Sequence, residues 1–75
     1  MNQQNIFAER LKALRIEKNL KQDEVANALN VTKTQISDME RGKRTTTMEK
    51  LTTLADYFNV STDYLLGRSD NPERH

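Results

Sequence analysis

The 75-residue chain has no cysteine and no tryptophan, one proline, two glycines, and a single histidine at its last position. The absence of cysteine excludes a disulfide framework and a thiolate metal site. Without an internal histidine, a glycine-rich phosphate loop or a spaced pair of carboxylates, the sequence gives no support to catalysis. We therefore predict a protein that is not an enzyme, needs no cofactor or metal, and has no evident small-molecule substrate.

Long apolar runs are also missing. The runs extend over no more than two or three residues, such as Ile6-Phe7 and Leu65-Leu66, whereas a membrane-spanning helix needs about 20 apolar residues. Nothing resembles a signal peptide. The sequence therefore predicts one small cytoplasmic domain without a membrane partner.

The net charge is only +1, but the charges are distributed unevenly. Residues 1–44 contain nine Lys or Arg and six Asp or Glu, a net of +3, whereas residues 45–75 contain three and five, a net of −2. A basic first part suits a polyanion such as nucleic acid. Ordinary charges that keep the chain soluble explain this excess equally well.

Residues that favour left-handed backbone conformations divide the chain into short segments, at Asn19, Asn30, Gly42, Asn59 and Gly67. Such residues end helices, and the apolar residues between them recur with a helical period. The sequence thus predicts an all-α fold of five helices, over about 5–18, 22–29, 32–41, 48–58 and 62–66. These helices form a domain over residues 1–67, and residues 68–75 form a flexible polar tail.

Capping residues precede most of these helices. Asn5 and Ser61 are predicted N-caps, and Thr32-x-x-Gln35 and Thr46-x-x-Glu49 are predicted capping boxes. Lys21 stands where a capping side chain is expected, which costs about 1 kcal/mol. The period of the fourth helix predicts a buried side formed by Met48, Leu51, Leu54, Ala55 and Phe58.

The second and third helices are joined only by Asn30 and Val31, and the small Ala26 allows them to cross closely. This pattern predicts a helix-turn-helix. At about 100° per residue, Ile36 and Met39 face inward. The opposite side presents a polar stripe within roughly 140°, in the order Lys33, Ser37, Arg41, Thr34, Asp38. Donors and acceptors of different length suit the base edges of a DNA major groove.

Five stretches also resemble the XRE/Cro/CI-type helix-turn-helix domains of lambdoid phage repressors. They are R-L-K-A-L-R (10–15), L-K-Q-D-E-V-A (20–26), V-T-K-T-Q-I-S-D-M-E-R-G-K-R (31–44), L-A-D-Y-F-N-V-S (54–61) and D-Y-L-L-G (63–67). The resemblance implies a compact five-helix bundle of the lambda-repressor-like type. It also implies that a homodimer binds an inverted repeat in double-stranded DNA.

The resemblance further implies roles for individual residues. Bases would be read by Thr32, Lys33, Thr34, Ser37 and Asp38. The DNA backbone would be contacted by Lys21, Gln22, Gln35, Arg41, Lys43 and Arg44. A partly buried salt bridge would join Arg15 to Glu40, and a small dimer contact would involve Val60, Tyr64 and Leu66. Asp38 leaves two readings open, because it can accept a hydrogen bond from a base or hold Arg41 toward a phosphate.

The sequence therefore predicts a sequence-specific, double-stranded DNA-binding transcriptional regulator, and specifically a repressor that occupies a promoter. Two alternatives stay open. One is an antitoxin or restriction-controller regulator with the same DNA-binding mode. The other is a helical module that binds protein, for which an exposed apolar groove is expected.

Overall fold

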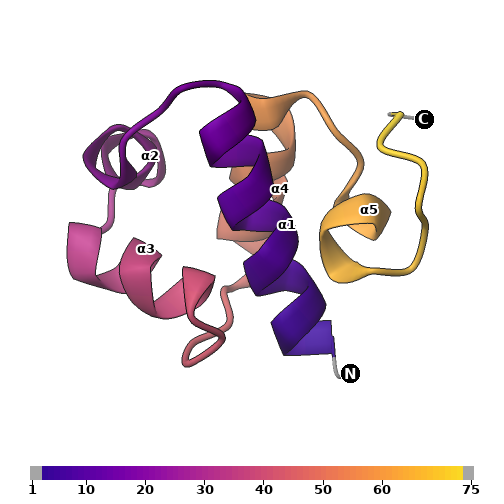
Figure 1. Cartoon of the computed structure of the whole chain (residues 1–75), viewed down its shortest axis with the longest axis horizontal. Coiled ribbons are helices and arrows are strands. Elements are labelled where there is room, and N and C mark those ends of the chain that lie inside the picture. Colours follow the sequence, from indigo (N-terminus) through magenta and orange to yellow (C-terminus); the bar gives the residue numbers. More distant parts are fainter. Residues whose placement is uncertain (1–2, 74–75) are drawn as a thin grey trace.

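The computed structural model describes residues 3–73, which form five α-helices and no strand (Figure 1). The helices are α1 (Gln3–Glu17), α2 (Gln22–Leu29), α3 (Lys33–Glu40), α4 (Met48–Phe58) and α5 (Thr62–Leu66). The predicted all-α fold class is confirmed. Within the described chain, no helix is long and apolar enough to cross a membrane. The predicted tail is described only as far as Glu73, and His75 lies outside the described residues.

Residues with a left-handed backbone conformation follow the helix ends, as the sequence predicts. Positive φ angles of 56–80° occur at Asn19, Asn30, Gly42, Asn59 and Gly67. After each of the three asparagines, the next backbone N–H returns to a carbonyl of the last turn, as Val31 N does to the Ala26 oxygen at 2.9 Å. These bonds satisfy carbonyls that a helix end would otherwise leave unpaired.

The predicted N-caps of α3 and α5, Thr32 and Ser61, are confirmed. Thr32 Oγ1 accepts a hydrogen bond from Gln35 N at 3.1 Å, and Gln35 Oε1 accepts one from Thr32 N at 2.9 Å. Ser61 Oγ accepts a hydrogen bond from Tyr64 N at 3.0 Å. Local side-chain chemistry therefore fixes where these two helices begin.

Two predicted caps are wrong. Helix α1 begins at Gln3 and continues through Asn5, so Asn5 is not its N-cap. Helix α4 is capped by Thr47, whose Oγ1 accepts a hydrogen bond from Lys50 N at 3.2 Å, and not by Thr46. Because α4 begins at Met48, only the hydroxyl of the residue immediately before it can reach the free N–H groups of the first turn.

The core receives apolar side chains from all five helices. The most completely enclosed are Phe7, Leu11, Val25, Ile36, Leu54 and Leu65. Met48, predicted to be buried, is 70% exposed. A helical side chain tilts toward the N-terminus of its helix, so the side chain of the first residue of α4 points beyond the helix end and away from the core.

Helix α1 contacts both halves of the molecule. It packs against α3 and α5, while α2 packs against α3 and α4, and α4 packs against α5. Figure 1 shows α2 and α3 on one side of α1, and α5 with the C-terminal segment on the other. Helices α2 and α3 and the described C-terminal segment, residues 68–73, therefore lie on opposite sides of α1.

Candidate nucleic-acid interface

Helix α3 is anchored by two buried side chains and presents its remaining surface outward. Ile36 and Met39 are 0% and 2% exposed. The predicted base-reading residues lie outside the core: Thr32, Lys33 and Thr34 are exposed, and Ser37 and Asp38 are half-buried. The structure thus brings the predicted polar stripe together on one accessible surface.

An ion pair between Arg15 and Glu40 joins α1 to α3. Arg15 Nε donates to Glu40 Oε2 at 2.6 Å, and Arg15 Nη2 donates to Glu40 Oε1 at 3.0 Å. The Glu40 side chain is only 4% exposed and that of Arg15 is 15% exposed. Arg15 Nη1 also donates to the Leu20 carbonyl at 2.9 Å. The hydrogen bonds to Glu40 raise the pKa of Arg15, against the opposing effect of its burial.

Gln22, the first residue of α2, extends this network. Its Nε2 donates to Glu40 Oε1 at 3.2 Å, so the carboxylate of α3 is linked to both α1 and α2. Gln22 is predicted from the sequence to contact the DNA backbone, and no sequence pattern indicates this intramolecular partner. An amide NH₂ group has two donor hydrogens, and one hydrogen bond to Glu40 leaves the second hydrogen for another acceptor.

The start of α2 adjoins the start of α3 across a shallow hollow. Lys21, Gln22 and Lys33 line this hollow together with Arg15 and Asp23. As predicted, Lys21 provides no side-chain cap for α2, although Glu24 Oε1 accepts a hydrogen bond from the Lys21 backbone at 3.0 Å. The hollow therefore combines positive side chains with a helix N-terminus, a combination that attracts anions.

Asp38 and Arg41 form an ion pair on the outward face of α3. Arg41 Nη2 lies 2.6 Å from Asp38 Oδ1. The Arg41 side chain is 56% exposed and the Asp38 side chain is 27% exposed. Of the two readings of Asp38, the free protein has the arrangement in which the acid orients the arginine. Gln35 is likewise engaged locally, because its side-chain oxygen completes the cap of α3.

Lys43 and Arg44 follow α3 in the loop that leads to α4, and both are exposed. Gly42, with φ 74°, turns the chain at the end of α3. Lys43 N then donates to the Asp38 carbonyl at 2.9 Å. This bond fixes the start of the basic loop against the helix that carries the polar stripe.

The predicted dimer residues are less accessible than the sequence suggested. Val60 is only 5% exposed and belongs to the core, while Tyr64 and Leu66 are half-buried. The guanidinium of Arg10 lies 4.2 Å from the centre of the Tyr64 ring. Arg10 was not predicted, because two of its three hydrogen-bond acceptors are backbone carbonyls, which no residue pattern marks.

The arrangement of α2 and α3, with a two-residue connection and an outward polar face on the second helix, is that of a helix-turn-helix. The family model described as helix-turn-helix matches residues 11–65. The chain belongs to the helix-turn-helix family. The matched region begins in α1 and ends in α5, so it includes the ion-pair network and the outward face of α3.

Relatives of this helix-turn-helix domain include two named regulators. The chain is 43% identical over 60 residues to the transcriptional activator BcrR of Enterococcus faecalis, covering 80% of this chain and 29% of BcrR. It is 39% identical over 64 residues to the transcriptional regulator ImmR of Bacillus subtilis, covering 85% of this chain and 50% of ImmR. The chain therefore spans half or less of the length of these relatives.

A solved structure with the same fold is the P22 c2 repressor in complex with a synthetic operator. Its TM-score is 0.79 and its sequence is 28% identical, with 84% of this chain and 96% of that chain covered. The lambda-repressor-like fold of this chain is thus shared with a repressor that was crystallised on a synthetic operator.

The Arg15–Glu40 pair predicts a large effect on stability. Glu40→Ala leaves the partly buried guanidinium and the Gln22 amide without their acceptor. We expect the free energy of unfolding to fall by roughly 2–3 kcal/mol. Glu17→Ala is the matched control, because Glu17 is exposed near the end of α1, and it should change stability by less than about 0.5 kcal/mol. Urea unfolding followed by circular dichroism measures both values, and two equally small losses would contradict a structural role of the pair.

Proposed function

We propose that this protein is a sequence-specific, double-stranded DNA-binding transcriptional regulator that represses by occupying a promoter. The observation that carries the proposal is the outward face of α3. There a contiguous polar stripe is held in place by two buried anchors and by the ion pair at Glu40. The membership of the helix-turn-helix family supports the same conclusion.

Helix α3 would enter the major groove, which is about 12 Å wide. Lys33, Thr34 and Ser37, with Thr32 at the helix start, supply the short and long hydrogen-bonding groups that distinguish base edges. Arg41, with its guanidinium directed by Asp38, would contact the DNA backbone from the same face.

Phosphates would be held on both sides of α3. One side has the hollow at the start of α2, which the basic side chains of Lys21 and Lys33 line. The second hydrogen of the Gln22 amide would donate to a phosphate on the same side. On the other side lie Lys43 and Arg44 in the loop. Such contacts fix the orientation of a protein on DNA, whereas base contacts provide the sequence preference.

Two copies would bind one operator as a symmetric pair. The P22 c2 repressor, whose fold this chain shares, was solved on a synthetic operator. Repression by occupancy requires only binding and no reaction, so it needs neither a cofactor nor a catalytic group. The proposed partner is DNA, and the proposed activity would take place in the cytoplasm.

Selection of binding sites from random duplex DNA tests this function. We expect the selected sites to be inverted repeats with half-site centres about 10–10.5 bp apart, or a multiple of that distance, because a two-fold pair of recognition helices imposes this spacing. Footprinting on a selected site should protect both half-sites. A protein that enriches no sequence from the random pool would contradict the proposal.

Lys43 and Arg44 should contribute affinity without sequence preference. Replacing either by Ala removes one phosphate contact, so binding should weaken on every duplex. The slope of the logarithm of the association constant against the logarithm of the salt concentration should become less steep by about 0.9. Arg68→Ala is the matched control, since it removes an exposed positive charge from the segment on the opposite side of α1. If the Arg68 variant has the same effect as the loop variants, the basic loop has no specific role.

Asp38 should act through Arg41. Since Asp38 Oδ1 already lies 2.6 Å from Arg41 Nη2, we expect Asp38→Ala to change affinity alike for all sequences and to leave the base preference unchanged at each position. Site selection with the variant, scored position by position, measures this. A loss of about 1–3 kcal/mol of discrimination at one base pair per half-site would instead assign Asp38 to base reading.

A further inference from the structure

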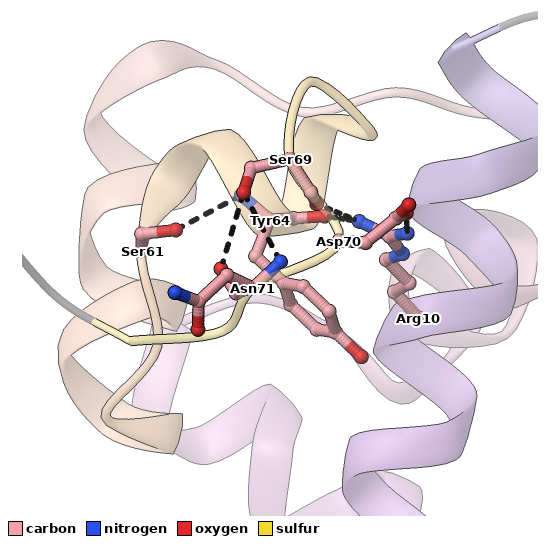
Figure 2. A network of polar contacts seen from close by, with 6 residues as sticks. All are labelled: Arg10, Ser61, Tyr64, Ser69, Asp70 and Asn71. Atoms are coloured by element: carbon pink, nitrogen blue, oxygen red, sulfur yellow. Dashed lines mark hydrogen bonds and ion pairs between the residues drawn. The ribbon is translucent and has the colours of Figure 1, made fainter.

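Residues 68–73, here called the C-terminal strap, turn back along α5 instead of leaving the domain. The Arg68 backbone N–H donates to the Asp63 carbonyl at 2.9 Å, and Ser61 N donates to the Pro72 carbonyl at 3.0 Å. Between them, Ser69 Oγ accepts a hydrogen bond from Asn71 N at 3.1 Å and closes a tight turn (Figure 2). The first bond closes the C-terminal turn of α5 after Gly67. The second bond attaches the far part of the strap to the residue that precedes α5.

Arg10 of α1 holds the middle of the strap. Its Nη1 donates to the carbonyls of Tyr64 and Ser69, the latter at 2.6 Å, and its Nη2 lies 2.8 Å from Asp70 Oδ1. Figure 2 shows the Arg10 side chain reaching from α1 toward these groups, with Tyr64 beside it. A guanidinium suits this position, since its planar set of donors reaches several acceptors at once.

The partners of Arg10 do not contribute equally. The Asp70 side chain is fully exposed, and exposed ion pairs contribute little to stability. The Arg10 side chain itself is only 19% exposed, so its hydrogen bonds to the two carbonyls and its contact with the Tyr64 ring are largely shielded from water. The Tyr64 carbonyl and ring belong to α5 and hold Arg10 against that helix. The shielded bond to the Ser69 carbonyl, and not the exposed pair with Asp70, is the contact of Arg10 that keeps the strap closed.

The closed strap adjoins Val60 and Tyr64, two of the three residues of the predicted dimer contact, of which Leu66 is the third. Val60 is 5% exposed. Val60 and Tyr64 line one groove of about 470 Å³ with Pro72 and Glu73 of the strap. The rest of its lining is mixed, with apolar and polar side chains from the ends of α1 and α4: Leu14, Glu17, Lys18, Phe58 and Asn59. The strap thus lies against the surface that a second copy of the chain would need.

We propose that the strap is an intramolecular latch, in which Arg10 holds residues 68–73 over the dimer contact and two copies associate only after the latch opens. This inference rests on the proposed function in one respect, namely the pairing of two copies through this contact. The occupant of the surface is the strap in the single chain and a second copy in the pair.

The latch acts twice in each dimer, because both copies must open. If the closed state is favoured about ten to one, roughly one copy in eleven can associate, and the apparent dissociation constant of the dimer is raised about 100-fold. Arg10→Ala, which removes the hydrogen bonds and the ring contact together, should abolish most of this effect.

Sedimentation equilibrium of the full chain without DNA tests the latch. We expect Arg10→Ala to lower the dimer dissociation constant by about 10-fold or more. Asp70→Ala, the matched control, removes only the exposed partner and should lower it by less than about 3-fold. Weaker or unchanged self-association of the Arg10 variant would overturn the proposal. The proposal would also be overturned if no variant formed dimers at any attainable concentration.

Amide hydrogen exchange separates opening of the latch from loss of the fold. The Ser61 N–H is bonded to the strap, whereas the neighbouring Val60 N–H is bonded to the Ala55 carbonyl at the end of α4. An opened latch should speed exchange at Ser61 and leave Val60 protected. If Arg10→Ala does not fold, Arg10→Lys replaces it in both measurements, self-association and amide exchange. This variant keeps the positive charge and loses the planar set of donors. Faster exchange at both amides would make Arg10 a stability residue and overturn the latch.

These measurements need no nucleic acid, so they fail independently of the proposed function. A chain that selects no DNA sequence can still show the latch in its self-association. Conversely, the chain could select an inverted repeat while the Arg10 variant associates as the original chain does. That result would support the proposed function and contradict the latch.

Discussion

The position of α3 depends on the ion pair between Arg15 and Glu40. Helix α3 spans Lys33–Glu40, which is 8 residues, and isolated helices of this length are unstable in water. Its two apolar anchors bury it against the core, but apolar contacts have little directional preference. The two hydrogen bonds from the Arg15 guanidinium to the Glu40 carboxylate do have a fixed direction. They therefore fix the rotation of α3 about its axis, and with it the face that the helix presents outward.

Much of the fold could be predicted from local signals in the sequence. The left-handed residues and the Thr32 and Ser61 caps act within one helical turn, so short stretches are enough to identify them. The prediction failed where neighbouring residues share the same chemistry. Thr46 and Thr47 can both cap a helix, and only the exact start of α4 selects Thr47. Met48 fits the apolar period of α4, yet it lies in the first turn, beyond the edge of the core.

The candidate site was predictable as a face and not as a set of contacts. Helical period alone places Lys33, Ser37 and Asp38 together. By contrast, the bond from Gln22 to Glu40 joins residues that are 18 positions apart and depends on how α2 crosses α3. The strap was less predictable still, because its acceptors are carbonyls and every residue has one.

The division of labour within α3 has an evolutionary consequence. Ile36 and Met39 hold the helix in the core and Glu40 fixes its orientation, whereas Lys33, Thr34 and Ser37 make no contribution to the buried cluster. Substitutions at these outward positions leave the buried packing intact, and surface changes of this kind usually alter stability by no more than about 0.5 kcal/mol. A lineage can therefore move from one operator to another through a series of folded intermediates. Duplicated copies of such a domain can diverge in the DNA they recognise while the scaffold beneath stays the same.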